Sequence, residues 1–173
     1  MTATPALLVV CGPPGVGKTT VAETLQERLD ARLLRTDLIR KELFPEPEYT
    51  DSEEAAVYGE LLDRAVATLR DDRAVVLDGT FHDRAYREEA ATVASEAGAD
   101  CQIVRVTCEE DVVAERMRNR EGDASDATFE IHMQFRECFD PVQGEHMAVD
   151  NSGTLEETLA QVRGIAPRGV EAE

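Results

Sequence analysis

The chain alternates short apolar runs with longer segments of helical periodicity. The apolar runs have the length of strands and lie at Leu7–Cys11, Arg32–Arg35, Ala74–Leu77, Cys101–Thr107 and His146–Val149. The segments between them repeat apolar residues every three or four positions, which predicts helices at Val21–Leu29, Ser52–Leu69, Arg84–Ala97, Glu109–Arg120, Thr128–Cys138 and Leu155–Ile165. Strands that alternate with helices indicate parallel βαβ units, whose sheet must be covered on both faces. We therefore expect an α/β fold of three layers.

The same pattern bears on the helix starts and on the domain organisation. Thr50 precedes the predicted helix Ser52–Leu69 and is followed three residues later by Glu53, which is the spacing of a capping box. Residues 45–49 and 120–126 show no periodicity and are expected to form mobile loops. Because the chain shows no internal repeat, we expect one domain over residues 1–166, with a short lid at about 117–127 and a frayed tail at 167–173.

The net charge of the chain limits its possible partners more than its composition does. The chain has 36 acidic and 18 basic residues, a formal net charge of −18, and Lys18 and Lys41 are its two lysines. Such a field repels long nucleic acid and anionic membranes, although it leaves nucleic acid 5′ ends open as partners. Since the acids are spread along the chain, the composition resembles the acidic surfaces of salt-adapted proteins. We find no run of about 18 to 20 apolar residues for a membrane helix, and we expect a cytoplasmic location.

The stretch CGPPGVGKTT, residues 11–20, carries the clearest chemistry. It contains the pattern G-x-x-x-x-G-K-[ST] between a short buried strand and an amphipathic helix. In that pattern the backbone N–H groups surround phosphate oxygens, Lys18 reaches the β- and γ-phosphates, and the Thr19 hydroxyl ligates Mg²⁺. We expect a nucleoside triphosphate here, bound by Gly12, Pro13, Pro14, Gly15, Val16, Gly17, Lys18, Thr19 and Thr20.

A second acid stands at the end of a predicted buried strand. Asp78 follows VVL, so it is expected at the carboxyl edge of the sheet, where open α/β sheets bind ligands. A carboxylate there can hold Mg²⁺ through its water shell. The other interpretation is that Asp78 caps a turn in which Gly79 supplies a positive φ. The neighbouring Thr80 is a candidate substrate contact or a structural residue at the strand end.

The stretch RTDLIRKEL, residues 35–43, places a carboxylate and a guanidinium on one helical face. Asp37 and Arg40 are three residues apart. Phosphoryl transfer to a hydroxyl needs a base for its proton and a cation for an anionic acceptor, and this pair would supply both. The same spacing fits an N-cap aspartate with a surface arginine, and spacing alone does not separate the two interpretations.

Three further arginines are candidate site residues. Arg116 and Arg120 are four residues apart and are expected on one helix face before a loop. Two guanidinium groups there suit a lid that closes over the triphosphate, whereas a solvated face paired with nearby glutamates is the other interpretation. Arg84, which follows the Asp78 strand, is a candidate for the acceptor pocket.

Taken in order, GPPGVGKTT, TDLIRKEL, VVLDGTF, ERMRNREGDASDAT, FDPV and AVDNSG resemble the small AAA-like P-loop kinase family. That family is akin to polynucleotide, gluconate and adenylylsulfate kinases and to zeta-toxin-like enzymes. The resemblance spans Leu7 to about Val162 and implies a three-layer P-loop kinase fold with a five-stranded parallel sheet of order 2-3-1-4-5. It also implies ATP and Mg²⁺ as cofactors, Asp37 as the base and Arg40 as a substrate contact. The catalytic residues expected from it are Lys18, Asp37, Arg116 and Arg120.

Two functions follow from these features. The first is an ATP-dependent kinase, a monomer or weak dimer, that phosphorylates the hydroxyl of a small-molecule or nucleotide-like acceptor. The second is a regulatory ATPase or nucleotide switch that transfers phosphate only to water, which would leave Asp37 and Arg40 without a task. The sequence does not identify the acceptor.

Overall fold

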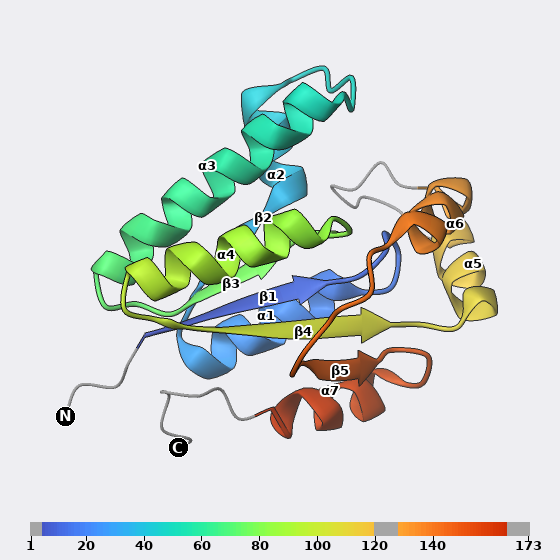
Figure 1. Ribbon diagram of the computed structural model, residues 1–173. Coiled ribbons are helices and arrows are strands. Elements are labelled where there is room, and N and C mark those ends of the chain that lie inside the picture. Colours follow the sequence, from blue (N-terminus) through green and yellow to red (C-terminus); the bar gives the residue numbers. More distant parts are fainter. Residues whose placement is uncertain (1–4, 120–127, 166–173) are drawn as a thin grey trace.

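The computed structural model describes residues 5–119 and 128–165. In these residues the strands form a parallel sheet in the order β2-β3-β1-β4-β5, which confirms the expected topology (Figure 1). The strands are β1 Ala6–Cys11, β2 Arg32–Arg35, β3 Val75–Asp78, β4 Asp100–Thr107 and β5 Met147–Asp150. Each lies within one or two residues of the corresponding apolar run, because these runs carry the side chains that the sheet buries.

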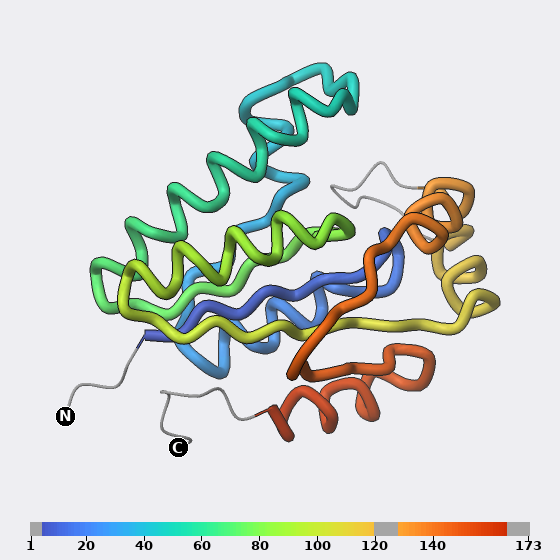
Figure 2. The backbone as a smooth tube through the Cα atoms, in the orientation of Figure 1, coloured from blue at the N-terminus to red at the C-terminus, as the bar shows by residue number. Residues whose placement is uncertain are grey.

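The central strand β1 explains the three layers. Its residues 6–11 are all fully buried, as expected for a parallel strand that is covered on both faces. Leu7, Val9 and Cys11 pack with apolar residues of two helices on one face, α3 and α4. Leu8 and Val10 pack with residues of α1 and α7 on the other face. Figure 2 shows α3 and α4 above the sheet and α1 and α7 below it.

Helices connect the strands, and two of them differ from the expectation. Their bounds are α1 Lys18–Leu29, α2 Thr36–Leu43, α3 Asp51–Arg70, α4 Arg84–Glu96, α5 Glu110–Arg118, α6 Phe129–Cys138 and α7 Leu155–Arg163. Helix α1 begins inside the phosphate-binding motif rather than at Val21, and α2, of 8 residues, was not among the helices predicted from the apolar pattern. Helix α2 buries Ile39 and places Asp37 in its first turn and basic residues in its last.

One predicted capping box is only half formed. The Thr50 hydroxyl accepts the N–H of Glu53 at the start of α3, as expected. The Glu53 carboxylate does not return to Thr50 but binds Arg40 at 2.7 Å and the N–H of Glu48 at 2.9 Å. The ion pair therefore ties α3 to α2, a tertiary role that displaces the local one.

The register brings the strand ends together at one edge of the sheet. Arg35 pairs with Asp78, and Asp78 pairs with Val10 just before the phosphate-binding loop. Among the described residues, no helix is both long and apolar enough to cross a membrane. Most of the predicted lid, Arg120 included, and the predicted tail lie outside the described residues, and those assignments stay predictions.

Candidate functional site

A cavity of about 260 Å³ opens at the carboxyl edge of the sheet. It is lined by Pro14, Gly15, Gly17, Lys18, Thr19, Thr20, Thr36, Asp37, Asp78, Gly79, Thr80, Arg116 and Met117. These residues come from the phosphate-binding loop, the starts of α1 and α2, the segment after β3, and α5. The predicted nucleotide-binding, metal-binding and proton-accepting residues thus lie around one space.

The loop before α1 has the backbone of an anion cradle. Gly12, Gly15 and Gly17 have φ values of 152°, 88° and 91°, which side-chain-bearing residues rarely adopt. Gly17 is also the N-cap of α1 and offers no side chain to the first N–H groups of the helix. These donors, with the positive end of the helix dipole, are available to phosphate oxygens. The Lys18 ammonium donates to the Pro13 carbonyl at 3.0 Å, so the lysine folds over the loop.

Two side chains that the sequence did not reveal, Asn151 and His132, hold this loop in place. The Asn151 amide donates to the Val16 carbonyl at 2.8 Å and accepts the Thr158 hydroxyl at 2.6 Å. His132 in α6 contacts the Pro14 carbonyl through Nδ1 at 2.7 Å. Asn151 stands directly after β5, at the sheet edge, and that position is the sequence signal that could have identified it.

Asp78 and Thr19 form the expected pair at the base of the cavity. The Thr19 hydroxyl donates to Asp78 Oδ2 at 2.8 Å. Burial raises the pKa of Asp78 above its usual range, although Lys18 and the Thr19 hydroxyl act in the opposite direction. A buried carboxylate beside a hydroxyl fits Mg²⁺, which prefers oxygen ligands and, once bound, would favour the ionised carboxylate. The pair therefore suits a metal that neutralises phosphate charge.

The turn after Asp78 is not built as the alternative interpretation supposed. Gly79 does not have a positive φ, whereas Phe81 does, with a φ of 47°. Glycine is needed at position 79 for space, because a Cβ there would lie 2.7 Å from Thr36 Cγ2.

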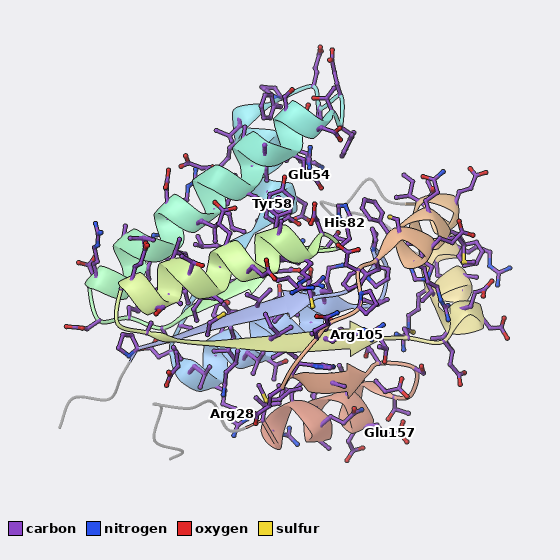
Figure 3. The ribbon with its side chains drawn as sticks, viewed as in Figure 1. Arg28, Glu54, Tyr58, His82, Arg105 and Glu157 are labelled. Carbon is purple, nitrogen blue, oxygen red and sulfur yellow. The ribbon has the colours of Figure 1, made fainter. Side chains whose placement is uncertain are left out.

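The N–H of Phe81 donates to the buried Tyr58 hydroxyl at 3.0 Å, and burial raises the pKa of Tyr58. Figure 3 shows Tyr58 and Glu54 on α3, with His82 opposite them.

Asp37 and Arg40 have different partners in the structure, although both belong to α2. Asp37 lines the cavity and pairs with Arg35 at 2.8 Å. Arg40 turns to the buried Glu53, and its guanidinium lies 4.9 Å from the centroid of the Tyr49 ring. Arg40 is not among the cavity-lining residues, so its predicted role as a substrate contact would require a change of partner.

The remaining predicted residues differ in where they lie. Thr80 lines the cavity, whereas Arg84 is half exposed and pairs with Glu88 at 2.6 Å on α4. Arg116 also lines the cavity, and its guanidinium donates to the carbonyls of Asn151 at 2.6 Å and Gly153 at 3.1 Å. Arg116 thereby joins α5 to the segment after β5. Its predicted role at the transferred phosphate stays a prediction.

His132 yields a prediction about stability and pH. It is almost fully buried, and burial lowers its pKa from the ordinary value of 6.5; Arg136 and Lys18 lower it further, whereas the Pro14 hydrogen bond and Glu110 oppose this. The unfolded chain therefore binds this proton more readily than the folded one. We expect the free energy of unfolding to fall as pH drops through about 6.5 and to level off below the lowered pKa.

Denaturant unfolding of the wild type and of His132→Asn between pH 8 and pH 5 measures this contribution, because the variant lacks the titrating group. His146→Gln, which alters a less buried histidine that contacts the Gly144 carbonyl two residues away, is the matched control. Parallel pH curves for the wild type and His132→Asn would contradict the assignment.

The sequence pattern of one family, AAA_33, described as AAA domain, matches residues 7–142. An uncharacterized protein of Mycobacterium tuberculosis (strain ATCC 25618 / H37Rv) is 36% identical over 141 residues, and the match covers 75% of this chain and 28% of that protein. An uncharacterized protein of Mycobacterium bovis matches to the same extent. The chain therefore spans 28% of the length of these curated relatives.

Several solved structures share the fold. A gluconokinase from Sinorhizobium meliloti 1021 has a TM-score of 0.71 and 24% identity, over 92% of this chain and 90% of that one. The Mycobacterium tuberculosis APS kinase CysC, in complex with AMPPNP and APS, has a TM-score of 0.69 and 18% identity, over 92% and 95%. Chaetomium thermophilum Kti12, in complex with ADP-AlF3, has a TM-score of 0.71 and 17% identity, over 91% and 96%. At these identities the likeness establishes the architecture of a P-loop kinase.

Proposed function

This chain belongs to the AAA_33 family of AAA domains and has a P-loop kinase fold, and on that premise we propose that it is an ATP-dependent kinase. It transfers the γ-phosphoryl group of ATP to a hydroxyl of a small-molecule or nucleotide-like acceptor. The observation that carries the proposal is the presence of Asp37 in the same cavity as Lys18, Thr19 and Asp78. A site for hydrolysis alone would not require a second carboxylate from α2 on the acceptor side.

Each residue has a role in this proposal. The backbone of the loop and Lys18 bind the triphosphate, while Thr19 and Asp78 would hold Mg²⁺. Mg²⁺, when bound, neutralises phosphate charge. Asp37 accepts the proton of the acceptor hydroxyl. The Arg116 guanidinium and, by resemblance, Arg120 stabilise the charge on the transferred group.

Thr80, Arg40 and Arg84 are the proposed contacts for the acceptor. Thr80 lines the cavity together with Asp37 and Asp78 and would contact the acceptor there. Arg40 and Arg84 would join it only by leaving Glu53 and Glu88, respectively. We propose the cytoplasm as the location and a monomer or weak dimer as the working form. The net charge of −18 disfavours long nucleic acid as acceptor, although nucleic acid 5′ ends remain candidates.

One observation favours the second function, a regulatory ATPase or nucleotide switch. The cation expected to hold an anionic acceptor, Arg40, is already neutralised by the buried Glu53. A protein that transfers phosphate only to water would have no need of a free cation there. The two functions differ in what accelerates ADP formation.

A screen of acceptors separates the two functions. ADP formation is measured with Mg²⁺ and ATP at low and at high KCl, alone and with sugars, polyols, nucleosides or oligonucleotides bearing a 5′-hydroxyl. We expect at least one acceptor to raise the rate about tenfold or more above the rate with water, because a positioned hydroxyl replaces a bulk nucleophile. Detection of the phosphorylated product completes the assignment. If no acceptor stimulates turnover and a partner protein does, the chain is a switch rather than a kinase.

A further inference from the structure

Arg35, at the end of β2, contacts two carboxylates of the cavity at once. Its Nη2 lies 2.8 Å from Asp37 Oδ2, and its Nε lies 3.5 Å from Asp78 Oδ2. We propose that Arg35 is a positioning residue that holds Asp37 in the orientation needed to accept the acceptor's proton. The inference rests on the proposed function, since it concerns the base of that reaction.

The fold places Arg35 in this position by register. Arg35 and Asp78 are partners in the parallel pairing of β2 with β3, so their side chains begin side by side at the carboxyl edge. Arg35 is also the N-cap residue of α2, and Asp37 stands in the first turn of that helix. One residue thus connects the strand that ends beside the metal-binding carboxylate with the helix that carries the base.

The contacts of Asp37 leave it little freedom to rotate. Oδ2 receives the Arg35 guanidinium, and Oδ1 accepts the N–H of Leu38 at 2.9 Å. The Asp37 side chain nevertheless remains 28% exposed, and the residue lines the cavity. Each carboxylate oxygen has two lone pairs, so both can accept a hydrogen bond and still take up a proton. Asp37 is therefore fixed in direction without being closed to an acceptor.

A guanidinium suits this task better than an ammonium does. Arg35 uses Nε and Nη2, two nitrogens on one edge of a planar group, to reach two different carboxylates. Lysine carries a single point charge and cannot present that edge. Asp37 raises the pKa of Asp78 while Arg35 lowers it, so the arginine also offsets the repulsion between the two acids.

In the step that Arg35 supports, the acceptor oxygen forms a bond to the γ-phosphorus and its proton passes to the Asp37 carboxylate. The bond from the γ-phosphorus to the bridging oxygen breaks, and its electron pair stays on ADP. A misplaced base slows this step without affecting nucleotide binding. Arg35 itself exchanges no proton.

A double-mutant cycle tests the proposal, with Arg35→Gln, Asp37→Asn and the double variant compared with the wild type. We expect Arg35→Gln to lower kcat about tenfold to a hundredfold, with the KM for ATP changed less than about threefold. Because Arg35 acts through Asp37, the double variant should be no slower than Asp37→Asn alone. Arg35→Lys should retain an intermediate rate. Thermal unfolding is measured on each variant, and the comparison uses those that remain folded.

Arg32→Gln is the matched control. Arg32 stands at the other end of β2, and its guanidinium donates to the Thr68 hydroxyl at 3.0 Å rather than to the cavity. The same loss of charge from the same strand should leave kcat within about twofold of the wild type.

The cycle is read on phosphoryl transfer to the acceptor that the screen identifies. If no acceptor is found, the kinase is contradicted, and the crystal structure of Arg35→Gln tests the positioning role by itself: a reoriented Asp37 carboxylate supports it, and an unchanged one overturns it. A double variant slowed by the product of the two single effects would overturn the role of Arg35, because Arg35 would then act through Asp78 or through the fold. A large rise in the KM for ATP in Arg35→Gln would overturn it as well.

Discussion

Asparagine in place of Asp37 is expected to lower the rate of phosphoryl transfer by about 10²- to 10⁴-fold, the usual contribution of a general base. Asparagine keeps the size of the side chain and can accept a hydrogen bond, but it cannot take up the acceptor's proton. Asp37 belongs to α2 rather than to the loop that binds phosphate, so the affinity for ATP should change less than about threefold. Single-turnover kinetics measure the rate of transfer, and titration with a fluorescent ATP analogue measures the affinity for ATP.

Asp63→Asn is the matched control for this change, because Asp63 is an exposed acid on α3 and its substitution removes the same charge. Its rate of transfer should equal that of the wild type. Transfer by Asp37→Asn at the wild-type rate would remove Asp37 from the mechanism and would direct attention to Asp78. A joint loss of rate and ATP affinity would instead indicate damage to the loop.

The architecture was predictable because the strands β1 and β3 are buried on both faces. In Leu7–Cys11 every residue faces one of the two cores, so the apolar run is continuous and its limits are visible in the sequence. Helix α2 was less visible, because its 8 residues bury Ile39 alone among mostly polar neighbours. Helix α2 packs against α3, and the ion pair between Glu53 and Arg40 joins the two helices.

The predictable part of the site is the part that is local in sequence. Gly17, Lys18 and Thr19 are identified by their spacing, since the loop that they form is one continuous segment. Asn151 and His132 support the same loop from 135 and 118 residues away, and no local spacing reveals such a contact. They could be recognised only once the sheet order had placed β5 and α6 beside the loop.

Arg35, and not Arg40, lies beside Asp37, because tertiary contacts determine the partner of each arginine. The helical spacing suggested that Arg40 would share a face with Asp37 and hold the acceptor. The buried carboxylate of Glu53 binds Arg40 at 2.7 Å instead, because a buried acid needs a cation close by. Arg35 took the place beside Asp37, an outcome that depends on the register of β2 against β3.

Alanine in place of Gly17 is expected to weaken nucleotide binding about 30-fold or more. Gly17 has a φ of 91°, and an added Cβ would overlap the amide nitrogen of Asn151. Backbone strain of about 1–2 kcal/mol and the loss of a buried hydrogen bond of about 1–3 kcal/mol sum to about 2–5 kcal/mol, which corresponds to a factor of about 30 to several thousand in affinity. Either the loop moves, or Asn151 gives up its contacts with Val16 and Thr158.

Gly98→Ala separates the clash from the strain, because Gly98 has a φ of 72° and a Cβ there would meet no atom within 4 Å. This control should lose about 1–2 kcal/mol of stability and keep the wild-type affinity for ATP, measured by calorimetry. Asn151→Ala combined with Gly17→Ala removes the overlap while leaving the strain, so part of the lost affinity should return. If Gly17→Ala alone binds ATP as the wild type does, the left-handed start of α1 is not what forms the phosphate site, and the donors would have to lie elsewhere in the loop.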